Sequence, residues 1–128
     1  MIKQVIDVDG YWKVIVFYNI DYSLSFAVLK EFDRLGISRE NLDTLWETMM
    51  SYEAKGVTYS DLNKHISIVL FNRHCVQKDY LNTLVHEAEH VKQAILKAYQ
   101  VEDKEEPPAY TIGYLVMKMW EVWKGLAS

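Results

Sequence analysis

The amino-acid sequence has 128 residues, of which 50% are hydrophobic, so it is long enough for one domain with one core and too short for two. Its net charge of −4, with both signs interspersed, excludes an electrostatic surface for nucleic acid, and no apolar run approaches the roughly 20 residues that cross a membrane. Cys75 is the only cysteine and the N-terminus has no apolar signal segment, which excludes an intrachain disulfide and predicts a cytoplasmic protein.

The N-terminal residues predict a β-hairpin. Residues 2–8 and 11–20 are rich in Val, Ile, Tyr and Phe, as β-strands are. Asp9 and Gly10 lie between them and form a pair that is typical of tight hairpin turns. The second strand is apolar at both sets of alternating positions, so we expect it to lie in the centre of a sheet.

Two helices are predicted next. Residues 22–35 have helical periodicity and end before Gly36, which is suited to a C-terminal cap. Residues 39–50 follow Ser38, a residue that favours the N-cap position. The apolar positions expected to face the core are Leu24, Val28, Phe32, Leu35, Leu42, Leu45, Trp46 and Met49.

Residues 56–60 and 65–71 predict two further strands, joined by a polar turn over residues 61–64. Together these segments predict an α+β domain, with a small mixed or antiparallel sheet of about four strands packed with helices. The polar segment 72–79, which contains His74 and Cys75, follows the last strand. It is either one wall of a functional site or a solvated connection.

Residues 80–99 predict an amphipathic helix of about five turns. The apolar stripe expected to face the core comprises Leu81, Leu84, Val85, Ala88, Val91, Ile95 and Tyr99. His86 and His90 lie on the opposite side of the helical wheel, among polar residues.

The helix carries the pentapeptide HEAEH at residues 86–90, an HExxH motif. His86 and His90 are separated by about 40° around the helix axis, so both imidazoles can bind a single Zn²⁺. Glu87 would lie beside the metal, where a general base takes a proton from zinc-bound water. The alternative is that the two histidines simply belong to a solvated helix face.

A last helix is predicted over residues 109–124, after a charged segment that ends in Pro107 and Pro108. The helix is nearly all apolar, so we expect it to be buried in the core or against a partner. If it runs antiparallel to the HExxH helix, the preceding loop brings Glu106, or else Glu105, toward the metal as a third ligand. The alternative role for these acidic residues is stabilisation of the helix dipole.

A second electrophile often assists zinc hydrolases, and Tyr110 is our first candidate for that role. Tyr114 and His74 are further candidates. Each of these side chains also has an ordinary structural interpretation, because tyrosines of a buried helix pack and satisfy their hydroxyl groups. Cys75 has no evident base beside it in the sequence, which disfavours a cysteine nucleophile.

Two segments resemble those of a known protein class. NTLVHEAEHVKQAI at residues 82–95 resembles the active-site helix of small HExxH proteins carried by bacterial mobile elements and phages. EEPPAYTIGYL at residues 105–115 is similar to the acidic and aromatic segment that follows in those proteins. The chain thus resembles the minimal zinc metallopeptidases of the zincin group, in the gluzincin-like form with His-His-Glu ligands.

The resemblance implies one zincin-like metallopeptidase domain over residues 1–128, with His86, His90 and Glu106 as zinc ligands and Glu87 as base. The sequence departs from the metzincins, because Gln93 and Leu96 replace the glycine and histidine of their longer motif.

The expected function is therefore hydrolysis of peptide bonds in a peptide or protein substrate with Zn²⁺ as cofactor. An extended substrate could add to an edge strand, either 56–60 or 65–71. The alternative is a non-catalytic regulatory or interaction module with a structural or vestigial metal site. Its partner-binding residues would be Met117, Met119, Trp120 and Trp123.

Overall fold

The computed structural model describes residues 2–20, 25–50, 56–72, 80–101 and 106–127. The structure does not describe a few side chains within these ranges, among them those of Leu42, Trp46, Met49 and Glu106. The predictions for Leu24, His74, Cys75 and Glu105 fall on residues that are likewise not described.

A four-stranded mixed sheet forms the centre of the fold. Its strands are β1 (Ile2–Val8), β2 (Trp12–Ile20), β3 (Gly56–Asp61) and β4 (Ile66–Asn72), in the spatial order β1-β2-β4-β3. β1 pairs with β2 and β3 pairs with β4 in antiparallel fashion, whereas β2 and β4 are parallel. The predicted α+β class with four strands is confirmed, and so is the central position of the strand after the hairpin turn.

The turns form as their residues predict. Asp9 and Gly10 both have positive φ angles, 51° and 79°, as a type I′ hairpin turn requires. The Tyr11 amide donates to the Val8 carbonyl across this turn at 3.1 Å. Gly36, with φ of 75°, ends the first helix in the left-handed conformation that glycine adopts most easily.

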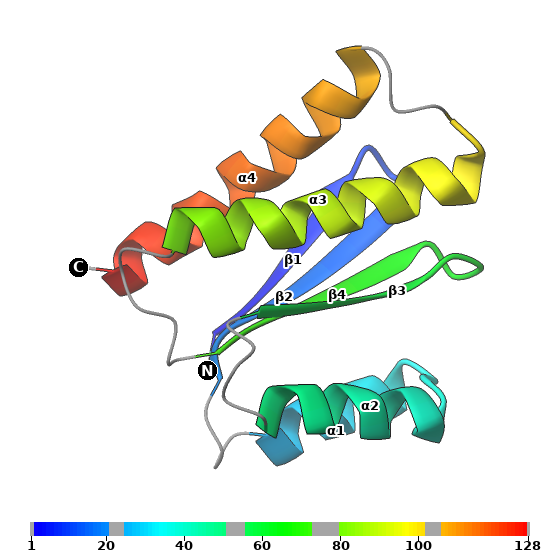
Figure 1. Ribbon diagram of the computed structural model, residues 1–128, viewed down its shortest axis with the longest axis vertical. Coiled ribbons are helices and arrows are strands. Elements are labelled where there is room, and N and C mark those ends of the chain that lie inside the picture. Colours follow the sequence, from blue (N-terminus) through cyan, green and yellow to red (C-terminus); the bar gives the residue numbers. More distant parts are fainter. Residues whose placement is uncertain (1, 21–24, 51–55, 73–79, 102–105, 128) are drawn as a thin grey trace.

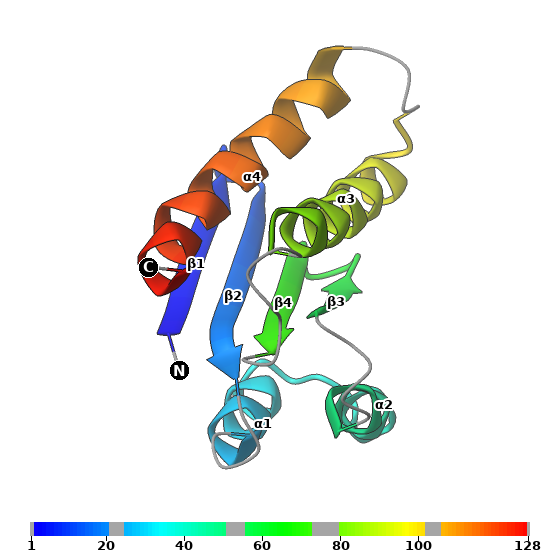
Figure 2. The same cartoon turned by 60° about the vertical axis from the view of Figure 1, so that its left-hand side comes forward.

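Helices cover both faces of the sheet. α1 (Ser25–Arg34) and α2 (Arg39–Met50) lie on one face, and α3 (Tyr80–Tyr99) and α4 (Glu106–Ala127) lie on the other (Figures 1 and 2). The Ser38 hydroxyl accepts a hydrogen bond from the Asn41 amide at 3.3 Å, so the predicted N-cap of α2 is confirmed. The result is three layers, with the sheet in the middle.

The two sheet faces bury separate hydrophobic cores. β2 contributes Val14, Val16 and Tyr18 to the core under α3 and α4, and Ile15, Phe17 and Ile20 to the core under α1 and α2. β4 contributes to both cores in the same alternating manner. None of the described helices is long and apolar enough to span a membrane.

α4 buries one face only, which corrects the prediction of a largely buried helix. Leu115, Met119 and Trp123 recur at every fourth residue and are buried against the sheet and α3. Met117 and Trp120 face outward with exposed fractions of 50% and 43%. The helix lies on the surface of a three-layer fold, so its outer side has nothing to pack against among the described residues.

The buried face of α3 also differs from the predicted stripe. Leu84, Ala88, Val91 and Ile95 are buried as expected, but Leu81, Val85 and Tyr99 are exposed. Their places in the interior are taken by Thr83, Glu87, Lys92 and Leu96. α3 contacts the edge strand β3 as well as α4, and this second contact turns part of the polar side of the helix inward.

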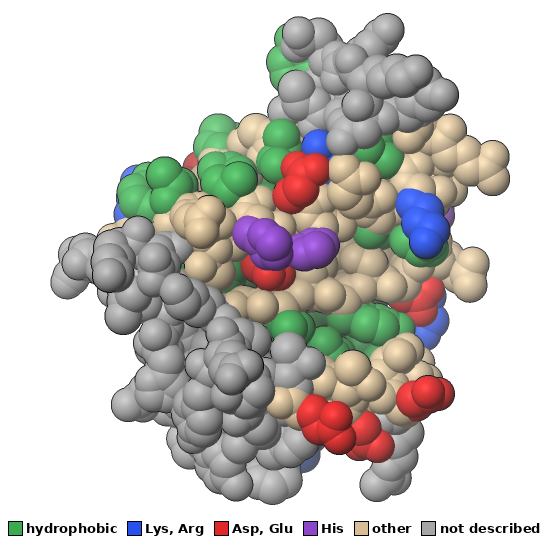
Figure 3. All heavy atoms as spheres, viewed as in Figure 1, with side chains coloured by type: hydrophobic (Ala, Val, Ile, Leu, Met, Phe, Trp, Pro, Cys, Tyr) green, Lys and Arg blue, Asp and Glu red, His purple; other side chains and the backbone are tan. Residues whose placement is uncertain are grey.

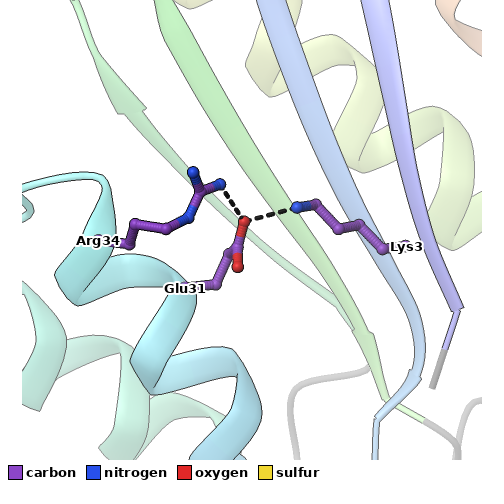
Figure 4. Close-up of polar contacts among 3 residues, drawn as sticks. All are labelled: Lys3, Glu31 and Arg34. Atoms are coloured by element: carbon purple, nitrogen blue, oxygen red, sulfur yellow. Dashed lines mark hydrogen bonds and ion pairs between the residues drawn. The ribbon is translucent and has the colours of Figure 1, made fainter.

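A charged cluster joins β1 to α1 (Figure 4). The Glu31 carboxylate accepts hydrogen bonds from Lys3 and Arg34 on the same oxygen, Oε1. These hydrogen bonds, first that from Arg34 and then that from Lys3, hold the pKa of Glu31 below its ordinary value of 4.5.

Glu31→Gln should lower the free energy of unfolding near pH 7 by about 0.5–1 kcal/mol, since exposed ion pairs contribute little. Because the folded-state pKa is lowered, this contribution is present above about pH 4.5 and is lost as the pH falls through the folded-state pKa. Urea denaturation of wild type and variant at neutral and acidic pH measures the difference. Asp33→Asn, a change at an exposed carboxylate of α1, is the control and should show no such pH-dependent loss.

Met119→Ala should lower the free energy of unfolding by about 2–5 kcal/mol, because it leaves a cavity in the core beneath α4. Met117→Ala removes the same side chain from the exposed side of the helix and should cost less than about 0.5 kcal/mol. Equal losses in a thermal or urea denaturation series would contradict the assignment of inner and outer faces.

Candidate metal centre

The imidazoles of His86 and His90 face each other on the outer side of α3. Their Nε2 atoms are 3.1 Å apart, and the rings are nearly perpendicular, with centroids separated by 4.7 Å. Both side chains are exposed. Figure 3 shows histidine side chains, in purple, side by side near the middle of the face in view. The predicted exposed position of the pair is confirmed.

The separation of the two nitrogens fits a shared zinc ion. Zn–N bonds of about 2.05 Å and a separation of 3.1 Å correspond to an N–Zn–N angle of about 100°, close to tetrahedral. The same separation also permits a direct hydrogen bond between the rings if one Nε2 carries a proton and the other does not. The two arrangements are distinguished by metal binding.

Glu87 lies beneath the histidine pair, between α3 and β3. Its side chain is only 4% exposed, and its Oε2 accepts a hydrogen bond of 2.7 Å from the Thr58 hydroxyl. The carboxylate and the ligand nitrogens of His86 and His90 lie within 4.8 Å of one another. Among the described residues, this is the one group of three or more His, Cys, Asp or Glu side chains that could hold a metal ion.

A buried carboxylate normally needs compensation by a cation or by several hydrogen bonds. Among the described residues, Glu87 forms no ion pair, and Thr58 is its only hydrogen-bonding partner. A cation bound by the two histidines would supply the missing positive charge. The donor set, two imidazole nitrogens with a nearby carboxylate, is one that Zn²⁺ prefers.

Gly56 allows the close approach of Glu87 to the sheet. A Cβ atom at this position would lie 3.0 Å from Glu87 Cγ and 3.2 Å from Thr83 Cγ2. The strand backbone at Gly56 therefore passes close to the Glu87 side chain. Thr58, two residues further along β3, donates the hydrogen bond to the Glu87 carboxylate.

The structure does not bring the start of α4 to the histidine pair. In Figure 1 the start of α4 is separated from α3 and lies on the side of its C-terminal half. His86 and His90 belong to the middle of α3, which spans Tyr80–Tyr99. His90 and Tyr99 are nine positions apart, which is about 14 Å along a helix. The side chain of Glu106 is outside the description, so its role as third ligand stays a prediction.

The two tyrosines predicted as second electrophiles do not contact the histidine pair. Tyr110 belongs to the start of α4 and is 73% exposed. The Tyr114 hydroxyl donates to the Asp7 carbonyl at 3.1 Å, which ties α4 to β1. Neither tyrosine is within hydrogen-bonding distance of His86 or His90, and His74 is outside the described residues.

Sequence reasoning missed Thr58 and Gly56. Both belong to β3, about 30 positions before Glu87, and neither stands in a recognised motif. The one available signal was the glycine at the start of a predicted strand, because glycine in a strand often marks the close approach of another group.

Comparisons of this chain with protein-family models, with curated proteins and with solved structures found no match.

Protein purified without added metal should contain about one zinc ion per chain, measured by elemental analysis. His86→Ala/His90→Ala should abolish this zinc, because it removes both nitrogen ligands. Glu89→Ala/Gln93→Ala is the matched control, since it also changes two residues four positions apart on the outer side of α3. Wild-type protein that takes up no zinc on titration would show that the imidazoles only bond to each other.

Proposed function

We propose that the protein is a zinc-dependent metallopeptidase of the HExxH type. One observation carries this proposal: the two exposed Nε2 atoms converge at 3.1 Å directly beside a buried carboxylate. An arrangement of surface histidines alone would not require a buried acid beneath them. The resemblance of residues 82–95 to the active-site helix of small HExxH proteins supports the same proposal.

Each residue has a defined part in the proposed reaction. His86 and His90 would hold the metal, and a zinc ion bound there would activate water and polarise a carbonyl group. Glu87 takes the proton from the attacking water and later gives it to the leaving amine. The burial of Glu87 limits its hydration, which strengthens its interaction with charge that develops in the site.

The substrate would bind in extended form along β3. This strand pairs with β4 on one side only, so its other edge is open to an added strand among the described elements. Thr58 of β3 contacts Glu87 directly, so a peptide on this edge would lie beside the proposed base. The sequence offered residues 56–60 or 65–71 as the edge strand for substrate. The second of these, β4, is central in the sheet, so only β3 remains.

The proposal also includes Glu106 as third ligand and Tyr110 as second electrophile. Both belong to the start of α4, where the Glu106 side chain is not described and Tyr110 is 73% exposed. A cytoplasmic location is also proposed, because the single cysteine gives the chain no internal disulfide.

Glu87→Gln should lower the rate of peptide hydrolysis by about 10²–10⁴-fold, because it removes the proton acceptor. The zinc content should not fall, because neither histidine changes. The assay measures cleavage of a library of internally quenched peptides with randomised central residues, and of denatured casein, with products identified by mass spectrometry.

Glu89→Gln is the matched control for this assay. It makes the same change two residues along α3, at a side chain that pairs with Lys92 outside the proposed site. Full activity of Glu87→Gln, or equal losses in both variants, would count against the assigned base.

The outer face of α4 supports a second candidate function, protein binding. Tyr110, Met117 and Trp120 are large apolar residues with exposed fractions of 43–73%. Met119 and Trp123 are buried in the core, so only Met117 and Trp120 of the four candidate residues are exposed. A binding module would be indifferent to Glu87→Gln, whereas a peptidase would not.

A further inference from the structure

The hydroxyl of Thr58 holds one oxygen of the Glu87 carboxylate against β3. Thr58 Oγ1 is 2.7 Å from Glu87 Oε2 and 3.5 Å from the Glu87 carbonyl oxygen, so its single proton is directed to the carboxylate. Among the described residues, no donor bonds to the second oxygen, Oε1. The carboxylate is thus fixed at one end and open at the other.

Gly56 fixes the position of the same side chain by contact. The Glu87 Cγ and Cδ atoms lie 3.0 and 3.3 Å from where a Cβ of residue 56 would be. The lack of a side chain at Gly56 therefore lets Glu87 lie close to the strand, where an added Cβ would require it to shift by a few tenths of an ångström. Contact with the strand and the Thr58 hydrogen bond both keep the carboxylate on the β3 side.

A carboxylate this close to two imidazoles has two possible roles. Two atoms that bind one tetrahedral zinc are about 3.4 Å apart, and the Glu87 oxygen lies within 4.8 Å of both ring nitrogens. A small rotation would therefore make Glu87 a ligand. A carboxylate bound to the metal is a weaker base, because the positive charge of the metal lowers its proton affinity.

We propose that Thr58, with Gly56 behind it, is a positioning residue that keeps Glu87 off the metal and so selects its role as base. This inference rests on the proposed zinc site. Thr58 contacts neither metal nor substrate in this scheme, and it acts only through Glu87. The hydroxyl holds Oε2 and leaves Oε1 to accept the proton of the attacking water.

Thr58→Val tests this inference because it removes the hydroxyl and preserves the shape of the side chain. Without its hydrogen bond, Glu87 should turn toward the metal and become a ligand. We expect zinc to bind about 10-fold more tightly, measured by competition with a chromophoric chelator, and kcat to fall about 10–100-fold with little change in KM. Thr58→Ser keeps the hydroxyl and should restore both values.

A double-variant cycle separates positioning from general damage. In a Glu87→Ala background, Thr58→Val should have no effect on zinc affinity, because the side chain through which it acts is absent. Gly56→Ala is an independent variant, since it should displace Glu87 from β3 and lower kcat while the fold is retained. Gly113→Ala is its control, because an added Cβ at Gly113 meets no atom within 4 Å. Thermal melts of all variants establish that each is folded.

The inference is overturned if Thr58→Val leaves zinc affinity unchanged, weakens it, or alters it equally in the Glu87→Ala background. If the wild type cleaves peptides, an unchanged kcat in Thr58→Val also overturns the inference. If the wild type binds zinc but cleaves no peptide, the proposed peptidase function fails, and the affinity cycle alone decides the positioning role. If the wild type binds no zinc, both proposals are wrong.

Discussion

The burial of both faces of β2 and β4 is the constraint on which the rest of the fold depends. These two parallel strands are apolar at successive positions, so neither face can remain in contact with water. Each face must be covered by helices, and the chain supplies one pair for each side. β1 and β3 are left as the edges of the sheet, and β3 thereby lies beside α3.

The candidate metal site follows from the way α3 lies on this sheet. Leu84, Ala88 and Val91 anchor the helix to the core beneath it. Since successive helical residues are about 100° apart, this anchoring turns Glu87 toward β3 and leaves His86 and His90 on the outer surface. Five consecutive residues thus provide a buried carboxylate and two exposed imidazoles at one place.

The buried carboxylate of Glu87 links stability to the proposed chemistry. Among the described residues one hydroxyl group hydrogen-bonds to it and no cation pairs with it. A structural acid would be better satisfied. A metal held by the adjacent imidazoles would place a positive charge beside this carboxylate.

The sequence by itself determined the elements and the first part of the site. The hairpin turn at Asp9-Gly10, the two-faced central strand, the cap at Ser38 and the helix that carries the HExxH motif all follow from local patterns, because turn geometry and periodicity depend on neighbouring residues. The convergence of His86 and His90 has the same local origin, since a four-residue spacing in a helix fixes it.

Only the tertiary structure decided which side chains surround that motif. Thr58 and Gly56 reach Glu87 because β3 is the edge strand under α3, and no local pattern specifies that pairing across about 30 residues. Hydrophobic periodicity also did not predict the exposure of Leu81, Val85 and Trp120. It identifies the apolar positions of a helix but not how much of the helix its neighbours cover. Burial and long-range contact depend on how layers meet in space, and that arrangement is a property of the whole chain.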